Sequence, residues 1–263
     1  MRRFKLVLIG LLPIVLMGQE FLILQPDGTD GKDAMIWAAP NFGTNDNNYG
    51  SSDQLVLNAW TNSTVPDTIR ALVEFDLSSV PVGSSITYAL LSFYNNASGA
   101  SHNGQHQNLD GTNEWEINRA IESWDEDEVT WENKPAYSSA GQILMSASSS
   151  PDQDYIDTDV TDMVQDMVDH PELNFGFYLK LQNETPYKAL VFASSEHETP
   201  EIRPRLILQY TLPVGLEEFN LSESRKLIRI TDMLGREIPY APGIPLILQF
   251  DDGTTEQRVI IEN

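Results

Sequence analysis

Apolar and polar residues alternate in short runs between residues 25 and 211. In the run 175–181, Phe175, Phe177, Leu179 and Leu181 occupy every second position. Runs of similar length lie at residues 54–60, 69–76, 86–94, 190–193 and 206–210. They are separated by stretches rich in Asn, Gly, Pro and Ser. A period of two over four to eight residues is typical of antiparallel strands with one buried face. The pattern therefore predicts an all-β domain over residues 19–211, an antiparallel jelly roll or β-sandwich.

One segment of this domain has the period of a helix instead. Its apolar residues recur at intervals of three and four, at Val160, Met163, Val164, Met167 and Val168. Asp159 and Thr161 are candidates to cap the helix, and Pro171 would end it. We expect one short helix that covers an end of the sandwich.

The first 18 residues have the pattern of a signal peptide. Arg2, Arg3 and Lys5 precede an apolar run at residues 6–17. Such a run is short for a membrane span but suits a signal-peptide core, with cleavage after Gly18. The alternative is a membrane anchor.

The last part of the chain predicts a small second β unit at residues 219–263, after a linker at 212–218. Three apolar runs, 227–231, 245–250 and 257–261, are separated by turn signals at 232–236 and 251–254. A segment of this size buries little apolar surface, so we expect it to be only marginally stable by itself.

Charge and cysteine content exclude several kinds of partner and chemistry. The 263 residues include 16 Lys and Arg against 39 Asp and Glu, a formal net charge of -23. Such a surface repels phosphate backbones and anionic lipids, so no nucleic-acid partner is expected. Neutral glycans, divalent cations and basic proteins remain open. The sequence has no cysteine, which excludes disulfides, thiolate metal sites and cysteine nucleophiles.

Five sequence blocks, in order, resemble the DNRLRE domain. They are Arg70-Ala-Leu-Val-Glu-Phe-Asp-Leu with Val80-Pro-Val-Gly83, Trp124 to Trp131 with Glu132-Asn-Lys-Pro135, Asp159-Val-Thr161, Asn174-Phe-Gly-Phe-Tyr-Leu179, and Phe192 to Tyr210. In the last block Glu196 stands where an aspartate is commoner. The resemblance implies a jelly-roll module counted among the carbohydrate-binding modules.

The aromatic and charged residues of these blocks have a structural interpretation beside the functional one. Trp124 and Trp131 flank an acidic stretch at 125–128, and we expect both rings to be core anchors. Arg70 is expected to pair with Glu74 or Asp76. The blocks would then determine mainly the fold.

The C-terminal segment resembles the sorting domain of type IX secretion substrates in the Bacteroidetes. The residues that carry the likeness are Asp232, Gly235 and Arg236 of Asp-Met-Leu-Gly-Arg, Gly243 of Pro-Gly-Ile, and Gly253 before a final Arg-Val-Ile-Ile. The segment lacks a Tyr-Pro-Asn-Pro opening and a terminal lysine. The resemblance implies recognition by the outer-membrane export machinery and a secreted or cell-surface location. The alternative is a β subdomain with no export role.

Sugar binding needs exposed aromatic faces beside amides and carboxylates, because pyranose C–H faces stack on rings and hydroxyls need donors and acceptors. Trp60 and Tyr49 lie beside loops rich in Asn and Ser, Tyr94 ends a strand, and Trp115 begins one. These four are the predicted carbohydrate-binding residues, with core or rim packing as the alternative for each.

Two acidic clusters are candidates for a structural Ca²⁺, because hard cations take six to eight oxygen ligands. The first is Asp152, Asp154, Asp157 and Asp159, and the second is Asp27, Asp30 and Asp33. His102 and His106, four residues apart in a glycine-containing loop, are a weaker candidate pair for zinc.

The sequence shows no phosphate-binding loop and no nucleophile elbow, so we expect no enzyme activity. The leading hypothesis is a secreted, non-catalytic polysaccharide-binding module. One alternative is a structural or adhesion subunit that binds other surface or outer-membrane proteins. Another is a lyase or hydrolase that works through the acidic loops.

Overall fold

The computed structural model describes residues 19–213, 227–232, 235–238, 245–251, 253 and 255–259. The chain divides into two units, Met1–Pro213 and Val214–Asn263, which are described separately. The predicted signal peptide, most of the predicted linker and Gly243 lie outside the described residues.

The first unit contains a four-stranded antiparallel sheet of order β1-β12-β5-β9. Its strands are β1 Gln19–Leu24, β12 Arg205–Thr211, β5 Ser85–Phe93 and β9 Tyr155–Asp159. β1 pairs with β12 from Gln19 opposite Thr211 to Leu24 opposite Leu206. The two ends of the unit are therefore held together by one ladder.

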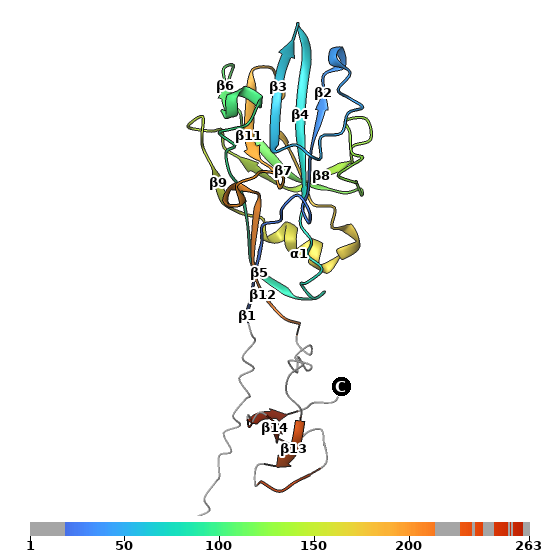
Figure 1. Cartoon of the computed structure of the whole chain (residues 1–263), viewed down its shortest axis with the longest axis vertical. Helices are drawn as coiled ribbons and strands as arrows, with labels where there is room; N and C mark the ends of the chain where they lie inside the picture. The colour runs from blue at the N-terminus through green and yellow to red at the C-terminus, as the bar shows by residue number, and fades with distance from the viewer. Residues whose placement is uncertain are drawn as a thin grey trace, which may run out of the picture. The chain divides into compact units, whose positions relative to one another are not determined.

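The second sheet has eight strands and carries most of the surface discussed below (Figure 1). Seven lie in the order β6-β11-β3-β4-β10-β7-β8, and β2 pairs with β4. Their bounds are β2 Lys32–Ala38, β3 Gln54–Asn62, β4 Val65–Glu74, β6 Gln107–Asn108, β7 Trp115–Ala120, β8 Tyr137–Met145, β10 Phe177–Leu181 and β11 Lys188–Ala193. The predicted all-β sandwich is confirmed.

The main core combines both sheets and is rich in rings. The Trp115 ring lies 5.1 Å from that of Tyr155 and 5.5 Å from that of Phe192, measured between centroids. Phe93 packs on the Trp115 and Phe192 rings at 6.0 and 5.5 Å. Rings in such offset and edge-to-face arrangements contribute beyond their buried area.

The predicted helix is present as α1 Thr161–Asp169, next to β5. Met163, Val164, Met167 and Val168 are buried, as their spacing predicts. The Thr161 Oγ1 accepts a hydrogen bond from the Ala89 N–H at 2.9 Å, which ties the helix start to β5. The N-cap position is Val160, not Asp159 or Thr161, although the Asp159 carboxylate accepts from the Thr161 N–H at 3.0 Å.

Short 3-10 turns connect several of the strands: η1 Pro40–Phe42, η2 Ser101–Gly104, η3 Pro171–Leu173 and η4 Pro200–Ile202. No helix in the described part of the chain is long and apolar enough to span a membrane.

The second unit has a three-stranded antiparallel sheet of order β13-β14-β15. The strands are β13 Leu227–Asp232, β14 Pro245–Phe250 and β15 Thr255–Val259. Asp232 and Arg236 close the turn after β13, where the Arg236 Nε lies 2.7 Å from the Asp232 Oδ2. Gly235 in that turn has φ +78, a conformation that glycine adopts without strain. These residues of the predicted sorting motif thus have a local structural role.

Candidate functional site

The outer face of the eight-stranded sheet carries a second, smaller apolar cluster. In the ladders Arg70 lies opposite Ile36, Leu72 opposite Ala34, and Tyr178 opposite Leu72. Directly opposed residues share a face, so these side chains all point away from the main core. The cluster comprises Ala34, Ile36, Leu72, Trp124, Val129 and Tyr178, with Trp131 packed against it.

The 121–136 loop, which joins β7 to β8, covers part of this face. Trp124 is buried there and its Nε1–H donates to the Phe175 carbonyl at 3.0 Å. The Asn48 side-chain amide donates to the carbonyls of Glu126 and Val129 at 2.6 and 2.9 Å. Trp124 is thus a packing anchor, as predicted. Trp131 packs on the edge of the cluster and remains partly exposed.

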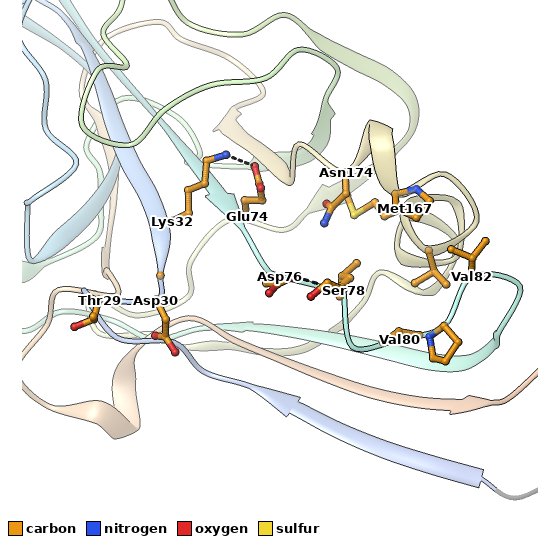
Figure 2. Close-up of a pocket in the computed structure, with 15 residues that line it drawn as sticks. Thr29, Asp30, Lys32, Glu74, Asp76, Ser78, Val80, Val82, Met167 and Asn174 are labelled. Atoms are coloured by element: carbon orange, nitrogen blue, oxygen red, sulfur yellow. Dashed lines mark hydrogen bonds and ion pairs between the residues drawn. The ribbon is translucent and has the colours of Figure 1, made fainter. Parts of the chain in front are cut away.

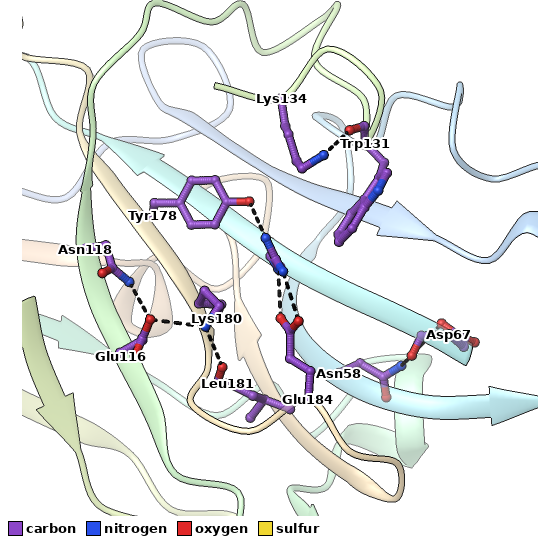
Figure 3. A network of polar contacts seen from close by, with 11 residues as sticks. Asn58, Asp67, Glu116, Asn118, Trp131, Lys134, Tyr178, Lys180, Leu181 and Glu184 are labelled. Atoms are coloured by element: carbon purple, nitrogen blue, oxygen red, sulfur yellow. Dashed lines mark hydrogen bonds and ion pairs between the residues drawn. The ribbon is translucent and has the colours of Figure 1, made fainter. Parts of the chain in front are cut away.

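Arg70 is the centre of a polar network beside that loop, and its partners Tyr178 and Glu184 are labelled in Figure 3. Its Nε and Nη2 donate to the two carboxylate oxygens of Glu184 at 2.8 and 2.9 Å, and its Nη1 donates to the Tyr178 hydroxyl at 3.1 Å. Burial by itself lowers the pKa of the guanidinium, but the hydrogen bonds to Glu184 and Tyr178 raise it overall. Arg70 therefore stays charged.

The predicted pairing of Arg70 with Glu74 or Asp76 is wrong. Lys32 on the neighbouring strand β2 pairs with Glu74 at 2.7 Å, and the Asp76 carboxylate accepts from the Ser78 N–H at 2.8 Å. Both carboxylates already have nearer partners, and Arg70 reaches a loop residue 114 positions away.

Two lysines extend the network on either side. Lys180 Nζ lies 3.1 Å from the Glu116 Oε1, which also accepts from the Asn118 amide at 3.1 Å. The buried Oδ1 of Asn118 has no hydrogen-bond partner among the described residues. Lys134 Nζ lies 4.5 Å from the centroid of the Trp131 ring, and the Arg70 guanidinium carbon lies 4.9 Å from the same ring. Lys134 forms no ion pair in the described part of the chain.

We call this surface the sheet platform and define it by its central side chains: Arg70, Trp131, Lys134, Tyr178, Lys180, Glu184, Glu116 and Asn118. Three of the seven basic residues between positions 39 and 210 lie on it, although the chain as a whole is strongly acidic. A partly exposed indole beside the charged groups of Arg70, Lys134 and Glu184 is the combination that sugar hydroxyls and ring faces require. Asn118 and Tyr178 are both 0% exposed and support the platform from beneath.

The structure does not gather the four aromatic residues that the sequence favours. No ring contact within the described residues joins any two of them. Trp60 is half-buried at the end of β3, with its ring 4.7 Å from His102 and 5.1 Å from Tyr187. Tyr94 is half-buried with the Arg205 guanidinium carbon 5.7 Å from its ring. Tyr49 packs against Trp37 at 5.4 Å and borders the main core.

Trp115 is a correction to the sequence prediction. Its side chain is 0% exposed in the centre of the main core, so it has no face that a sugar could reach. The sequence showed that Trp115 begins a strand but not which face of β7 it occupies. In the sandwich this face points into the core.

The first predicted calcium cluster is also not assembled. The Asp154 carboxylate accepts from the Asn95 N–H at 2.8 Å, Asp157 lies 3.7 Å from Arg205, and Asp159 binds the start of α1. Asp152 is exposed. These side chains serve separate local contacts and do not converge on one point.

The second predicted cluster is divided between two places. Asp27 and Asp30 stabilise their own turn, in which the Asp27 N–H donates to the Asp30 carboxylate at 2.8 Å. Asp33 instead meets Glu126 and Glu196, and one carboxylate oxygen from each lies within 4.8 Å of the others. In the described residues this is the one group of three acidic, histidine or cysteine ligands close enough for a metal ion.

The two histidines do not form a zinc pair. His102 Nε2 contacts the Asn58 Oδ1 at 2.9 Å. His106 accepts from the Val191 N–H through Nδ1 at 3.0 Å, and its Nε2–H donates to the Gln153 carbonyl at 2.8 Å. Both nitrogens of the buried His106 ring are therefore occupied in its neutral form.

His106 is expected to make stability depend on pH. Burial lowers its pKa, against smaller opposing effects of the Gln153 hydrogen bond, Asp154 and Asp152. A folded-state pKa below the unfolded value of about 6.5 gives stability that is present above that pH and lost as pH falls. The difference in unfolding free energy between the wild type and His106→Gln should therefore be larger at pH 7.5 than at pH 5, in urea titrations. An equal difference at both pH values would contradict this assignment.

A pocket of about 690 Å³ lies elsewhere, between the start of β2, the end of β4 and α1 (Figure 2). Its wall contains the Lys32–Glu74 ion pair, Asp76, Met167 and Asn174, among others, and no aromatic side chain. A pocket without a ring offers no stacking surface for a pyranose, so the sheet platform is the better candidate for sugar binding.

The comparison with known proteins gives one family match. Residues 39–210 match the model of carbohydrate-binding module family 96. That range includes every side chain of the sheet platform and all strands of the sandwich except β1 and β2, with β12 matched through Tyr210. No curated protein matches the chain.

Proposed function

Because the chain belongs to carbohydrate-binding module family 96, we propose that it binds a polysaccharide without catalysis and that the sheet platform is the binding surface. The match over the sandwich is the observation that carries the function. The polar network around Arg70 and Trp131 supports the location (Figure 3).

The sheet platform contains both a tightly held side chain, Arg70, and a less constrained one, Lys134. Arg70 is held from three directions by Glu184, Tyr178 and the Trp131 ring, so its position is fixed before a ligand arrives. Fixed groups lose little conformational entropy on binding. Lys134 lies over Trp131, donates to the Trp131 carbonyl at 2.8 Å and has no carboxylate partner among the described residues. If that one hydrogen bond is exchanged for a bond to a sugar hydroxyl or carboxylate, the side chain can turn away and uncover the indole for stacking.

The test is binding of the full chain to neutral glucans and to acidic polysaccharides such as pectin and alginate, followed by calorimetry. With the polysaccharide that binds, we expect Trp131→Ala and Lys134→Met each to weaken affinity about tenfold or more, the usual effect of an interface anchor. Trp60→Ala, which removes a ring outside the platform, is the matched control and should bind normally. Loss with Trp60→Ala and not with the platform variants would move the site to the end of β3.

The absence of catalysis has its own measurement. Incubation of the chain with the bound polysaccharide should release no new reducing ends and no unsaturated products. Release of either, lost in a Glu116→Gln or Glu184→Gln variant, would show that the platform carboxylates act as catalysts.

We also propose that the chain is exported to the cell surface through the periplasm and outer membrane. The basic start, the apolar run at 6–17 and the tail's likeness to type IX sorting domains support this route. Fusion of residues 212–263 to a secreted reporter should place it on the surface of a Bacteroidetes host with a type IX system. Periplasmic retention of the fusion in that host would contradict the proposal.

A further inference from the structure

Three segments distant in the sequence meet at the carboxylate cluster of Asp33, Glu126 and Glu196. Asp33 lies at the start of β2, Glu126 in the 121–136 loop, and Glu196 just after β11. The Asp33 N–H donates to the Glu126 Oε1 at 2.7 Å, and the Ser195 N–H donates to the Asp33 Oδ2 at 2.8 Å. Backbone N–H groups therefore hold the carboxylates of Asp33 and Glu126, and the Glu196 carboxylate accepts from the Ser195 hydroxyl at 3.2 and 3.1 Å.

The Asp33 side chain has a buried acceptor that no described residue satisfies. Asp33 is 3% exposed, and its Oδ1 is buried without a hydrogen-bond partner among the described residues. An unpaired buried acceptor on a charged group is costly, and such groups are normally paired or bound to a metal. The nearest acidic side chains, Glu126 and Glu196, supply only further acceptors when ionised.

Little positive charge acts on the cluster in the described part of the chain, where Lys32 lowers the pKa of Glu126 but less than the other causes change it. No Lys or Arg in the described part of the chain forms an ion pair with any of the three carboxylates. Lys32, the neighbour of Asp33, is paired with Glu74 at 2.7 Å. Burial, then repulsion by Glu196 and Glu126, raises the pKa of Asp33 well above its ordinary value. Burial raises the pKa of Glu126 to about 6. The hydrogen bond from the Asp33 N–H acts against this rise, and the negative charge of Glu196 adds to it.

The backbone around the cluster is closely packed. A Cβ on Gly50 would lie 2.3 Å from the Glu126 carbonyl oxygen, and a Cβ on Gly31 would lie 2.5 Å from the Ser195 side chain. Glycine at these two positions lets the neighbouring loops approach the residues that carry the carboxylates.

From this geometry we propose that Asp33, Glu126 and Glu196 form a Ca²⁺ site. All three ligands are carboxylates, which suit a hard cation, and the cluster holds no histidine or cysteine to favour zinc. Ca²⁺ accepts one or both oxygens of a carboxylate and fills its remaining positions with carbonyls and water. Mg²⁺ binds through only one or two carboxylates as a rule and keeps several waters.

The bound ion would join β2, the 121–136 loop and the segment after β11. Since the 121–136 loop also carries Trp131 and Lys134, the ion would order the loop that borders the sheet platform. The metal site itself does not depend on the proposed sugar function, because it is tested with the cation alone.

The experiment is a titration of CaCl₂ into the chelator-treated full chain, by calorimetry and by thermal unfolding. We expect saturation at one ion per chain, with a Kd of about 10⁻⁴ M or tighter. At a hundredfold excess over Kd the melting temperature should rise by about 5–10 °C. Amide hydrogen exchange in the 121–136 loop should slow on addition of Ca²⁺.

Asp33→Asn should abolish the Ca²⁺-dependent shift. It removes one of three repelling charges, so the variant in chelator should be at least as stable as the wild type in chelator. Asp152→Asn is the matched control, because Asp152 belongs to the predicted acidic cluster whose carboxylates do not converge. This variant should keep the full Ca²⁺-dependent shift. If Asp33→Asn does not fold, Glu126→Gln replaces it, because Glu126 is only half-buried.

Three results would overturn the proposal. One is the absence of saturable Ca²⁺ binding. Another is a thermal shift with Mg²⁺ as large as that with Ca²⁺. The last is an unchanged Ca²⁺ shift in the folded Asp33→Asn or Glu126→Gln variant. Loss of sugar binding with intact Ca²⁺ binding would overturn the proposed function alone.

Discussion

Replacing Trp115 with alanine is expected to lower the free energy of unfolding by about 3–5 kcal/mol, the usual cost of truncating a buried tryptophan. The Trp115 ring is fully buried and contacts Phe93, Tyr155 and Phe192. The variant loses the transfer free energy of the indole and leaves a cavity between rigid rings that cannot close over it. A urea titration measures the loss from the shift in midpoint at constant slope.

A second substitution separates ring packing from the indole N–H. The buried Trp115 Nε1 has no hydrogen bond of good geometry among the described residues, although it acts on the nearby Tyr155 hydroxyl. Trp115→Phe therefore removes a poorly satisfied donor while it reduces the ring. We expect Trp115→Phe to cost clearly less than Trp115→Ala. Leu144→Ala on the exposed side of β8 is the surface control and should change stability by about 0.5 kcal/mol or less. A loss below about 1 kcal/mol for Trp115→Ala would contradict the placement of this ring in the core.

Arg70→Ala is expected to have the second largest effect, about 3 kcal/mol, the lower end of the range for breaking a buried ion pair. The lower end applies because the pair is not fully buried: the side chains of Arg70 and Glu184 are 16% and 24% exposed. The substitution removes both hydrogen bonds to Glu184, the bond to Tyr178 and the contact with Trp131. It also leaves the Glu184 carboxylate without its cation.

The reason for this loss can be tested with a double-mutant cycle. Glu184→Gln keeps an acceptor for the guanidinium, so it should cost less than Arg70→Ala. The double variant Arg70→Ala/Glu184→Ala should cost less than the sum of the single alanine variants, because it leaves no unpaired charge. The free energies of unfolding of all these variants are measured by urea titration at pH 7. Strict additivity would show that Arg70 acts through packing and not through its pairing with Glu184.

Alternation predicted β4, β5, β10 and β12, and short apolar runs predicted β3 and β11, which are buried on both faces. β2 was missed because it does not alternate. Met35 packs in the main core, while Ala34 and Ile36 pack in the second cluster on the other face. β8 was missed for the opposite reason, since most of its residues are partly or fully exposed. A strand with similar surroundings on both faces gives no period-two signal.

Most of the candidate sites could not be predicted from the sequence, because they depend on contacts between residues that are far apart along the chain. Composition and local pattern identified the all-β class, the helix and the anchoring role of Trp124, and the resemblance of the five blocks implied a carbohydrate-binding module. They could not show that Arg70 meets Glu184 across 114 positions, or that Asp33 meets Glu126 across 93. Pairs at such separations are set by strand order and register, which depend on the packing of the whole sandwich.

The sequence by itself therefore determined several strands of the sandwich, because alternation and short apolar runs are local properties of a strand with a buried face. Only the tertiary structure decided which face of β7 holds Trp115 and which carboxylates converge. An aromatic residue next to a loop can lie in the core, as Trp115 does, or at the surface, as Trp131 does. Only the positions of distant strands and loops distinguish the two cases.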